Sequence, residues 1–445
     1  MKSKILKVLK YLSIFFLIII TFNILLYLSC SFNSNLIKNN VISSYKILKK
    51  QGSRLVVSKS LDIMNDNNTD ALIMNEAISI DAKNPYVSYM KMRKNYRKDI
   101  TIKELEDMNY EGVVLNHSNK QKRNTISYSY KPIVELGNFI NSKIYTSLNY
   151  GRYWHGYMVM YRPLLLIFNI SQIRILLFLF FVGLFTYFTY LIYKAFGKNI
   201  AIIFGLSLLL SGYFSAAISL ECAPIFLVMI ISSIILLKRL DKIKDIYFFV
   251  FIVACISNYV DFLTVPLITL GIPLIIYFLK LMKENHTFSY YFRILNICTI
   301  VWFFGYAGTW IMKWVLYDMT ISHKESMLYI SIIQSFFRTQ NSYKNFPRIL
   351  STFLFIIRFI NKYLVYIPLA TLILIYINKF KTSFKFNNKV YLFLIISLYP
   401  IIWWILLLKH SNVHYYFVYR HSLLFIIGIL LSLNEILLKN QNKSF

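Results

Sequence analysis

The chain has 445 residues, of which 57% are hydrophobic and only 15% are charged. A soluble domain carries about a quarter charged residues, so this composition excludes an ordinary soluble protein and indicates contact with lipid. The formal net charge is +30, but many lysines and arginines lie in short clusters between apolar runs, a pattern that sets membrane orientation and argues against a nucleic-acid partner.

The first apolar run, Tyr11 to Cys30, is about 20 residues long, enough to cross a hydrocarbon core of about 30 Å. It is long for the apolar part of a signal peptide, so we expect residues 1–30 to form an uncleaved first transmembrane helix. Similar windows follow near residues 172–193, 199–215, 219–237, 246–260, 262–280, 292–316, 361–379, 389–408 and 420–438. The sequence therefore predicts an all-α polytopic membrane protein with about ten transmembrane helices.

Lysines and arginines in the connections predict the orientation of these helices, because short basic connections stay in the cytoplasm. Alternate connections carry them, at residues 2–10, 194–198, 238–244, 280–283, 379–389 and 439–443. We therefore expect a multi-pass protein of the cell membrane with both its N-terminus and its C-terminus in the cytoplasm.

Two predicted outer segments are longer than turns. Residues 31–171 form an expected extracytoplasmic module, whose apolar stretches 131–150 and 157–170 are too short or too interrupted to span the bilayer. Because Arg162-Pro163 breaks the second stretch, we expect both as helices lying along the membrane surface. Within the helix bundle of residues 172–445, a second outer loop runs from about 317 to 361, and its stretches 329–337 and 349–360 are also interfacial in character.

Polar residues that interrupt the apolar pattern fall at the outer ends of the predicted helices. Ionisable groups are costly in a membrane, so such a residue is a functional candidate by default. Five separate segments contribute, with Arg152, Trp154 and His155, then Glu221, then Asp261, then Lys313, and finally His410, His414 and Arg420. Ordinary roles stay open, because tryptophans anchor at the interface, arginines hold lipid phosphate, and Lys313 is expected to reach the headgroups.

Asp261 and Asp70 are the candidate catalytic carboxylates. Asp261 begins the predicted helix 262–280, whose N-terminal dipole favours a carboxylate, so a helix N-cap is the alternative to a catalytic role. Asp70 follows Asn67-Asn68-Thr69, a turn and cap, and its alternative is a carboxylate in the first turn of a helix. In the functional interpretation Asp70 faces the membrane mouth as a general base or cation ligand.

Residues 410–421 form the densest polar cluster. His410 and His414 are four residues apart and share a face if this segment is helical, a spacing that suits a metal pair but equally suits hydrogen bonds to phosphate. Because no nearby carboxylate or cysteine completes a zinc shell, contact with phosphate or sugar is favoured.

The layout of about ten helices, a cytoplasmic N-terminus and a large first outer loop with surface helices resembles the GT-C class of integral membrane glycosyltransferases. Members of that class use polyprenyl-phosphate-linked sugars and carry a catalytic carboxylate in that loop. Tyr150-Gly151-Arg152-Tyr153-Trp154-His155 and the set Tyr259, Asp261 and Phe262 are also similar to motifs of uncharacterised bacterial membrane proteins of this layout. The chain departs from the class because residues 31–61 contain no acid and the loop has no Asp-x-Asp pair, so Asp70 is the substitute.

The resemblance implies transfer of a sugar from a polyprenyl-phosphate donor to a surface glycan or glycolipid on the outer face. Asp70 or Asp261 would supply the base, positive side chains would bind the departing phosphate, and Trp154 would hold the sugar. The expected substrate-binding residues are Arg152, Trp154, His155, Glu221, His410, His414 and Arg420. No cofactor is required by these residues, although a divalent cation stays open.

Two other classes of function remain as alternatives: a flippase or exporter of lipid-linked or polymeric glycans, and a noncatalytic membrane scaffold. Transporters usually place ionisable groups near the bilayer midplane and show repeated halves. The predicted midplanes of this chain are nearly free of charge. This distribution favours the transferase over the transporter.

Overall fold

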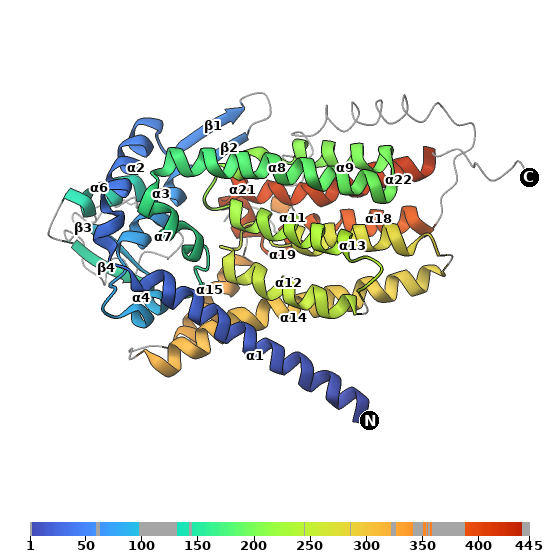
Figure 1. Ribbon diagram of the computed structural model, residues 1–445, viewed down its shortest axis with the longest axis horizontal. Helices are drawn as coiled ribbons and strands as arrows, with labels where there is room; N and C mark the ends of the chain where they lie inside the picture. Colours follow the sequence, from blue (N-terminus) through green and yellow to red (C-terminus); the bar gives the residue numbers. More distant parts are fainter. Residues whose placement is uncertain are drawn as a thin grey trace, which may run out of the picture.

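The computed structural model describes residues 2–58, 63–97, 131–141, 145–243, 245–284, 286–321, 326–340 and 388–437, with 350–352, 354 and 357. These residues are mostly helical, and the strands among them form two small antiparallel sheets near one end of the molecule. Figure 1 shows long helices side by side in a bundle, with the sheets and short helices of the first outer segment gathered at its left end.

Within the described residues, five helical segments are long and apolar enough to cross a membrane. They are Leu9–Ser31 of α1 (Lys2–Ser31), α8 (Ile170–Phe196), α14 (Phe288–Thr320), Asn388–Leu406 with α18 (Asn388–Ser397) and α19 (Tyr399–Leu406), and Tyr415–Ile436 with α21 (Tyr415–Val418) and α22 (Ser422–Leu437). Shorter apolar helices in the bundle are α9 (Lys198–Leu210), α11 (Ala223–Lys238), α12 (Ile246–Val260) and α13 (Ile268–Leu281). The predicted window 361–379 lies outside the described residues.

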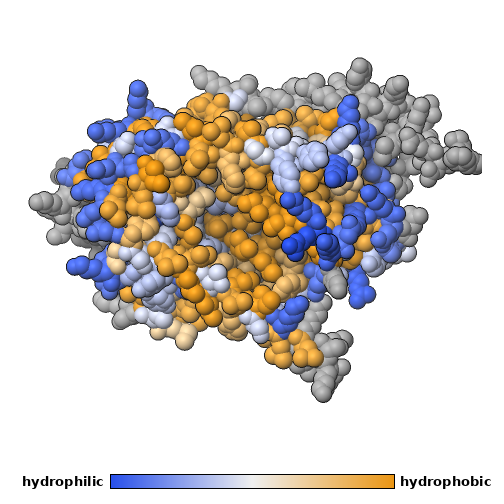
Figure 2. All heavy atoms as spheres, viewed as in Figure 1, coloured by the Kyte–Doolittle hydropathy of each residue, from blue (hydrophilic) through white to orange (hydrophobic). Residues whose placement is uncertain are grey.

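The surface of the bundle is that of a membrane protein. Figure 2 shows a hydrophobic belt across the middle of the molecule, between hydrophilic regions at both ends. Large apolar side chains of the long helices are exposed, among them Leu179, Phe303 and Phe304. Because such an area is stable only against hydrocarbon, these side chains contact membrane lipid, and the predicted class of all-α membrane protein is confirmed.

The helix ends that carry the basic connections meet at the end of the bundle opposite the sheets (Figure 1). Side-chain contacts tie neighbouring connections together. They are Lys10 with the ring of Phe248, Lys283 with the Ala195 carbonyl, Lys280 with Asp241, and Lys389 with Glu435. Among the described residues, the connections near 10, 195, 241 and 280–283 are therefore neighbours in space.

The first outer segment folds as a compact module. Its elements before residue 100 are η1 (Ser34–Ile37), α2 (Lys38–Gln51), β1 (Arg54–Ser58), β2 (Ile63–Asp66), α3 (Asn67–Ile78), α4 (Pro85–Lys91) and β3 (Arg93–Arg97). Later elements are α6 (Pro132–Asn141), β4 (Tyr145–Asn149) and α7 (Met158–Ile167). β1 pairs with β2, and β3 with β4, both antiparallel.

The expected surface helix over residues 131–150 is wrong in its second half. Only α6 is helical, and residues 145–149 form β4, whose register with β3 runs from Arg93 opposite Asn149 to Arg97 opposite Tyr145. Segments distant in sequence make this pair, so the local apolar pattern could not reveal it.

The expected break at Arg162-Pro163 is also wrong. Pro163 lies inside α7, and the helix continues to Ile167. α7 packs against α1, α2 and α3 with Met158, Tyr161 and Arg162 buried, whereas Leu166 and Ile167 are exposed, so its position along the membrane surface stays a prediction. Proline removes one hydrogen bond, but the surrounding contacts hold the helix.

Three short elements complete the described chain at the same end as the module. They are α10 (Tyr213–Ala217), α15 (Met327–Arg338) and α20 (Leu408–Val413), with η2 (Tyr419–His421) leading into α22. α15 confirms a helix over the predicted amphipathic stretch 329–337, with Phe336 exposed and Arg338 buried. The other predicted stretch, 349–360, lies largely outside the described residues.

Candidate functional site

Arg162 joins the module to the first long helix. Its Nε donates to the Ser29 carbonyl at 2.9 Å, and its Nη2 donates to the Phe32 carbonyl at 2.8 Å. Nη1 donates to the Ala77 carbonyl of α3. The last carbonyls of a helix have no hydrogen-bond donor within it. Arg162, from a distant part of the chain, supplies donors at the end of α1.

Asp70 and Arg174 form a second tie between the module and the bundle. Arg174 Nη2 donates to Asp70 Oδ2 at 2.6 Å, and the Leu220 N–H donates to Asp70 Oδ1 at 3.1 Å. Asp70 is fully buried, and burial raises its pKa to about 6 although Arg174 opposes the shift. The ion pair with Arg174 favours a positioning role for Asp70 over the expected general base.

Lys313 of α14 does not reach toward headgroups, so that expectation is wrong. Its side chain is fully buried, and Nζ donates to the Tyr89 carbonyl at 3.1 Å. Nζ also lies 5.6 Å from the ring of Tyr89 and 5.4 Å from the ring of Trp154. The Tyr89 carbonyl of α4 therefore takes the place of a water molecule as hydrogen-bond acceptor for the Lys313 amine. We call Arg162, Arg174 and Lys313 the anchor cations.

A second group of side chains lies where the module meets α14 and α15. Tyr153 stacks on Trp310 with ring centroids 5.6 Å apart. Arg338 Nη2 donates to the Tyr153 hydroxyl at 2.7 Å, and its guanidinium lies 5.5 Å from the Trp310 ring. The Arg152 guanidinium lies 5.1 Å from the Tyr153 ring. Two arginines from separate segments therefore flank one aromatic pair.

The backbone of Arg152 is fixed by the bundle. Trp310 and Trp314 of α14 both donate to the Arg152 carbonyl, at 2.7 and 2.8 Å. A side chain at Gly151 would collide with the Met90 carbonyl and the Tyr317 ring, so only glycine allows this close approach. The aromatic pair and Arg152 thus have a defined position relative to α14.

Asp261 ends α12 and does not cap α13, which begins only at Ile268, so the expected N-cap is wrong for that helix. Its Oδ1 accepts from the Thr264 N–H at 3.0 Å, and its Oδ2 accepts from the Tyr306 hydroxyl at 3.0 Å. Leu263 in this turn has φ +68°, a costly conformation for a bulky residue that is often found at functional sites.

The histidine cluster lies against the same turn. His410 Nε2 donates to the Leu263 carbonyl at 2.9 Å, and the rings of His410 and His414 are 4.7 Å apart. His414 Nδ1 is 3.2 Å from the Tyr416 hydroxyl, which donates to Asp66 in β2. We define the outer seam as Arg152, Tyr153, Asp261, Tyr306, Trp310, Arg338, His410 and His414.

Metal binding stays a prediction for these residues. No group of three or more His, Cys, Asp or Glu side chains is arranged to hold a metal ion within the described part of the chain. The divalent cation considered from the sequence therefore has no geometric support from these side chains.

Arg420 belongs to a separate network. Its Nη2 donates to Asn65 Oδ1 at 2.8 Å and to the Ser215 hydroxyl at 2.9 Å, which joins η2 to β2 and α10. The sequence predicted both Arg152 and Arg420 among the substrate-binding residues, whereas in the structure it is Arg338 that lies beside the aromatic pair that Arg152 also contacts. Glu221 is buried nearby and interacts electrostatically with Arg420, Asp66 and Asp70.

Trp154 does not offer a platform for a sugar. It is fully buried, its Nε1 donates to the Thr309 carbonyl at 2.7 Å, and Phe22 packs against it with ring centroids 5.9 Å apart. Of the two stacked rings described above, Trp310 is only half-buried. Trp310, which the sequence places at the outer end of its predicted helix, therefore offers more ring surface to a sugar than Trp154 does.

His155 faces a carboxylate that the sequence analysis did not select. Its Nε2 donates to the Tyr150 carbonyl at 2.8 Å, and its Nδ1 meets the Tyr157 hydroxyl. That hydroxyl donates to Glu76 Oε2 at 2.7 Å. His155 is therefore buried in a hydrogen-bonded group with Tyr157 and Glu76, and its expected contact with substrate stays a prediction.

Three seam or near-seam residues were missed from the sequence: Glu76, Lys94 and Arg338. Lys94 of β3 lies over the Tyr150 ring at 4.1 Å, and burial, with help from Arg152, lowers its pKa to about 8. Arg338 carried a usable signal, because it is the basic residue that ends the amphipathic stretch 329–337 in the second outer loop.

The predicted convergence of five chain segments is visible in these contacts. Trp310 and Trp314 bind the Arg152 carbonyl, His410 binds the turn after Asp261, and the Leu220 N–H beside Glu221 binds Asp70.

Comparisons of the chain with protein-family models, curated proteins and solved structures give no match. The resemblance to the GT-C class therefore stays a prediction carried by layout and by these residues.

Proposed function

We propose that the chain is a multi-pass protein of the cell membrane with about ten transmembrane helices and both termini in the cytoplasm. This topology is supported by the difference between the two ends of the helix bundle. Basic connections gather at one end, the module lies at the other, and an apolar belt lies between them (Figures 1 and 2). On this topology the outer seam faces the extracytoplasmic side.

On that side the protein transfers a sugar from a polyprenyl-phosphate donor to a surface glycan or glycolipid. The observation that carries this proposal is the pair of arginines, Arg152 and Arg338, held against the stacked rings of Tyr153 and Trp310. A guanidinium matches two phosphate oxygens at once, and a half-buried indole offers an apolar face to a sugar ring. The two requirements of such a donor are met by adjacent side chains.

Asp261 is the better placed of the two candidate bases. It lies in the seam and contacts Tyr306, whose ring is 6.4 Å from that of Trp310, whereas Asp70 is bound to Arg174. In the proposed step the acceptor oxygen bonds to the anomeric carbon and gives its proton to Asp261. The bond from that carbon to the phosphate oxygen breaks, and the arginines stabilise the charge on the departing polyprenyl phosphate.

The test uses purified protein in liposomes with a panel of radiolabelled polyprenyl-phosphate sugars. We expect release of polyprenyl phosphate by the wild type, a loss of at least about 100-fold in Asp261→Asn, and normal binding of the donor by that variant. Arg239→Lys, an exposed arginine at the opposite end, is the matched control for substitutions in the seam.

The same assay separates the alternatives. Donor that crosses the bilayer with its phosphate–sugar bond intact would identify a flippase or exporter. A protein that neither binds nor cleaves any donor in the panel would be a noncatalytic scaffold.

A further inference from the structure

The exposed side of helix α2 carries charges of one sign. Val41, Ser44 and Leu48 are buried against the module and the start of α8, whereas the lysines of this helix are all exposed. With about 3.6 residues per turn, these lysines lie on the face opposite the buried one. The arginine that begins β1, three residues after the helix, is exposed as well. We define the basic face as Lys38, Lys46, Lys49, Lys50 and Arg54.

Within the described residues, no carboxylate forms an ion pair with this basic face. Residues 31–58 contain no Asp or Glu. The exposed Asp81 has Lys83 and Arg93 as nearby cations. The buried acids of the described module are Asp66, Asp70, Glu76 and Glu135. The module therefore keeps most of these carboxylates inside and presents the cations of α2 and β1 to its surroundings.

Arg54 leads from the basic face to the outer seam. Its guanidinium lies 5.4 Å from the Tyr416 ring, and the Tyr416 hydroxyl lies 3.2 Å from His414 Nδ1 in the seam. The Ser44 hydroxyl of α2 accepts from the Ile170 N–H at 2.8 Å, which holds the helix against the start of α8. The basic face thus has a defined position beside the candidate site.

We propose that the basic face binds a linear anionic polymer of the cell surface and that this polymer is the acceptor of the transferred sugar. From Lys38 to Lys50 the lysines extend over about 18 Å of helix, at 1.5 Å per residue. A single small anion cannot contact a row of this length. A chain that repeats its charge can contact all of it, and the release of counterions favours that contact.

The surroundings of α2 favour a polymer over lipid headgroups. A basic amphipathic helix binds a membrane by inserting its apolar face, but the apolar face of α2 is buried against protein. Binding of the polymer does not depend on the proposed sugar transfer. Its role as the acceptor rests on that function, through the contacts that join Arg54 to the seam.

The experiment measures binding of fluorescently labelled inorganic polyphosphate to the full-length protein in phosphatidylcholine nanodiscs, without any sugar donor. We expect Lys46→Gln, Lys49→Gln and Lys50→Gln combined to weaken binding at least about tenfold. The slope of log K against log salt should fall by about 2, or roughly 0.7 for each lost contact. Because the three lysines are exposed, the melting temperature should stay at the wild-type value.

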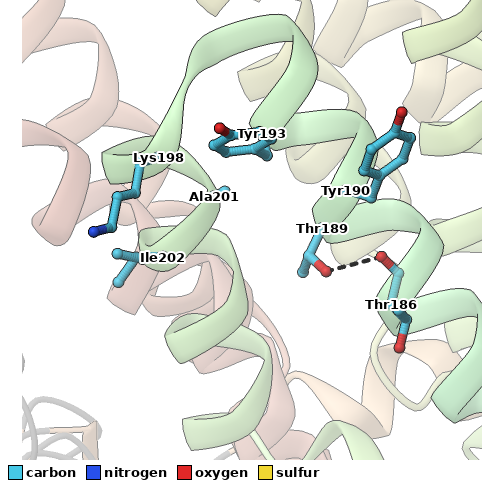
Figure 3. Close-up of a pocket in the computed structure, with 7 residues that line it drawn as sticks. All are labelled: Thr186, Thr189, Tyr190, Tyr193, Lys198, Ala201 and Ile202. Atoms are coloured by element: carbon cyan, nitrogen blue, oxygen red, sulfur yellow. Dashed lines mark hydrogen bonds between the residues drawn. The ribbon is translucent and has the colours of Figure 1, made fainter.

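A matched variant removes three exposed lysines at the opposite end of the bundle, with Lys194→Gln, Lys198→Gln and Lys242→Gln. Figure 3 shows one of them, Lys198, at the pocket between α8 and α9, with its amine directed away from Tyr190. This variant has the same net charge as the first and should bind polyphosphate like the wild type. Equal losses in the two triple variants would show attraction by net charge alone and would overturn the proposal.

Two further outcomes separate the polymer from a membrane and from the transfer reaction. If the first variant binds polyphosphate normally but retains less phosphatidylglycerol from mixed micelles, the basic face binds headgroups and the proposal is wrong. If polyphosphate binding depends on the basic face while no donor is cleaved, the polymer site stands and the proposed transfer fails. Cleavage of donor by a protein whose polyphosphate binding ignores the basic face would overturn the polymer site alone.

Discussion

The anchor cations and the arginines of the outer seam are equally buried, yet their surroundings differ. Arg162 and Lys313 donate to backbone carbonyls, and Arg174 donates to a carboxylate. Arg152 and Arg338 donate instead to neutral side chains, Arg152 to Gln334 and Arg338 to the Tyr153 hydroxyl. The difference teaches that burial of a cation in this protein does not identify its role. The partner does, because backbone carbonyls and a carboxylate fix a fold, whereas a substrate can displace a neutral side chain.

The largest effect is expected from Arg162→Met. This change leaves the Ser29, Phe32 and Ala77 carbonyls buried without their donor, at about 1–3 kcal/mol for each. We expect loss of folded protein, measured as the monodisperse fraction in fluorescence-detected size-exclusion chromatography.

Arg162→Lys should also fail, because one ammonium cannot reach three carbonyls. Arg152→Lys in the outer seam should remain folded. Equal yields of the two lysine variants would remove the distinction between the anchor cations and the seam.

Asp70→Asn is expected to be the next most severe change. It leaves Arg174 without its carboxylate partner, and breaking a buried pair costs about 3–5 kcal/mol. Thermal unfolding followed by tryptophan fluorescence should show the loss, and Asp70→Asn combined with Arg174→Gln should recover part of it. A well-folded Asp70→Asn protein that no longer transfers sugar would instead return Asp70 to the role of general base.

A smaller effect is expected in the outer seam, from Arg152→Lys and Arg338→Lys. Each keeps the charge but loses the planar two-pronged geometry, which should weaken binding of polyprenyl phosphate about tenfold without lowering stability. Binding measured by fluorescence quenching should be non-additive, with the double variant close to the worse single one. Additive losses would mean that the two arginines do not share a phosphate. Arg420→Lys, measured in the same assay, tests the separate network around Asn65.

The smallest expected effect is a pH dependence that arises from Lys94, at the edge of the seam. Burial lowers its pKa to about 8 from 10.5, so between these values the folded protein binds fewer protons than the unfolded chain. Stability should therefore rise as the pH increases from about 8 to 10. The melting temperature of the wild type should gain a few degrees over Lys94→Met across this range, and parallel curves for the two proteins would contradict the assignment.

The long helices were predictable because each is determined largely by its own residues. The window 246–260 coincides with α12, since an uninterrupted apolar run needs no distant partner to be helical. β3 and β4 were not predictable, because Arg93–Arg97 and Tyr145–Asn149 become strands only by pairing with each other. Pro163 gave a false signal for a related reason: Arg162, its neighbour, is held by carbonyls far away in sequence.

The candidate site was predictable in its location and not in its contacts. Several of the polar segments are in contact, but the adjacent residues Tyr153 and Trp154 have opposite surroundings. Trp154 is buried beneath Phe22 and Lys313, whereas Tyr153 stacks on Trp310 beside two arginines. Which ring enters the core depends on the register of the module against α14, and a single sequence carries no record of that register.

The bond from Arg162 to Ser29 spans 133 residues, and this separation has a consequence for synthesis of the protein. Ribosomes add about 5–20 residues per second, so the end of α1 waits roughly 7–27 s before its arginine emerges. During that interval the carbonyls at Ser29 and Phe32 can be satisfied only by water, which keeps the end of the helix at the edge of the bilayer. The first helix is therefore inserted before Arg162 can bind its end, and a nascent chain stalled ahead of α7 would leave the Ser29 and Phe32 carbonyls without their donor.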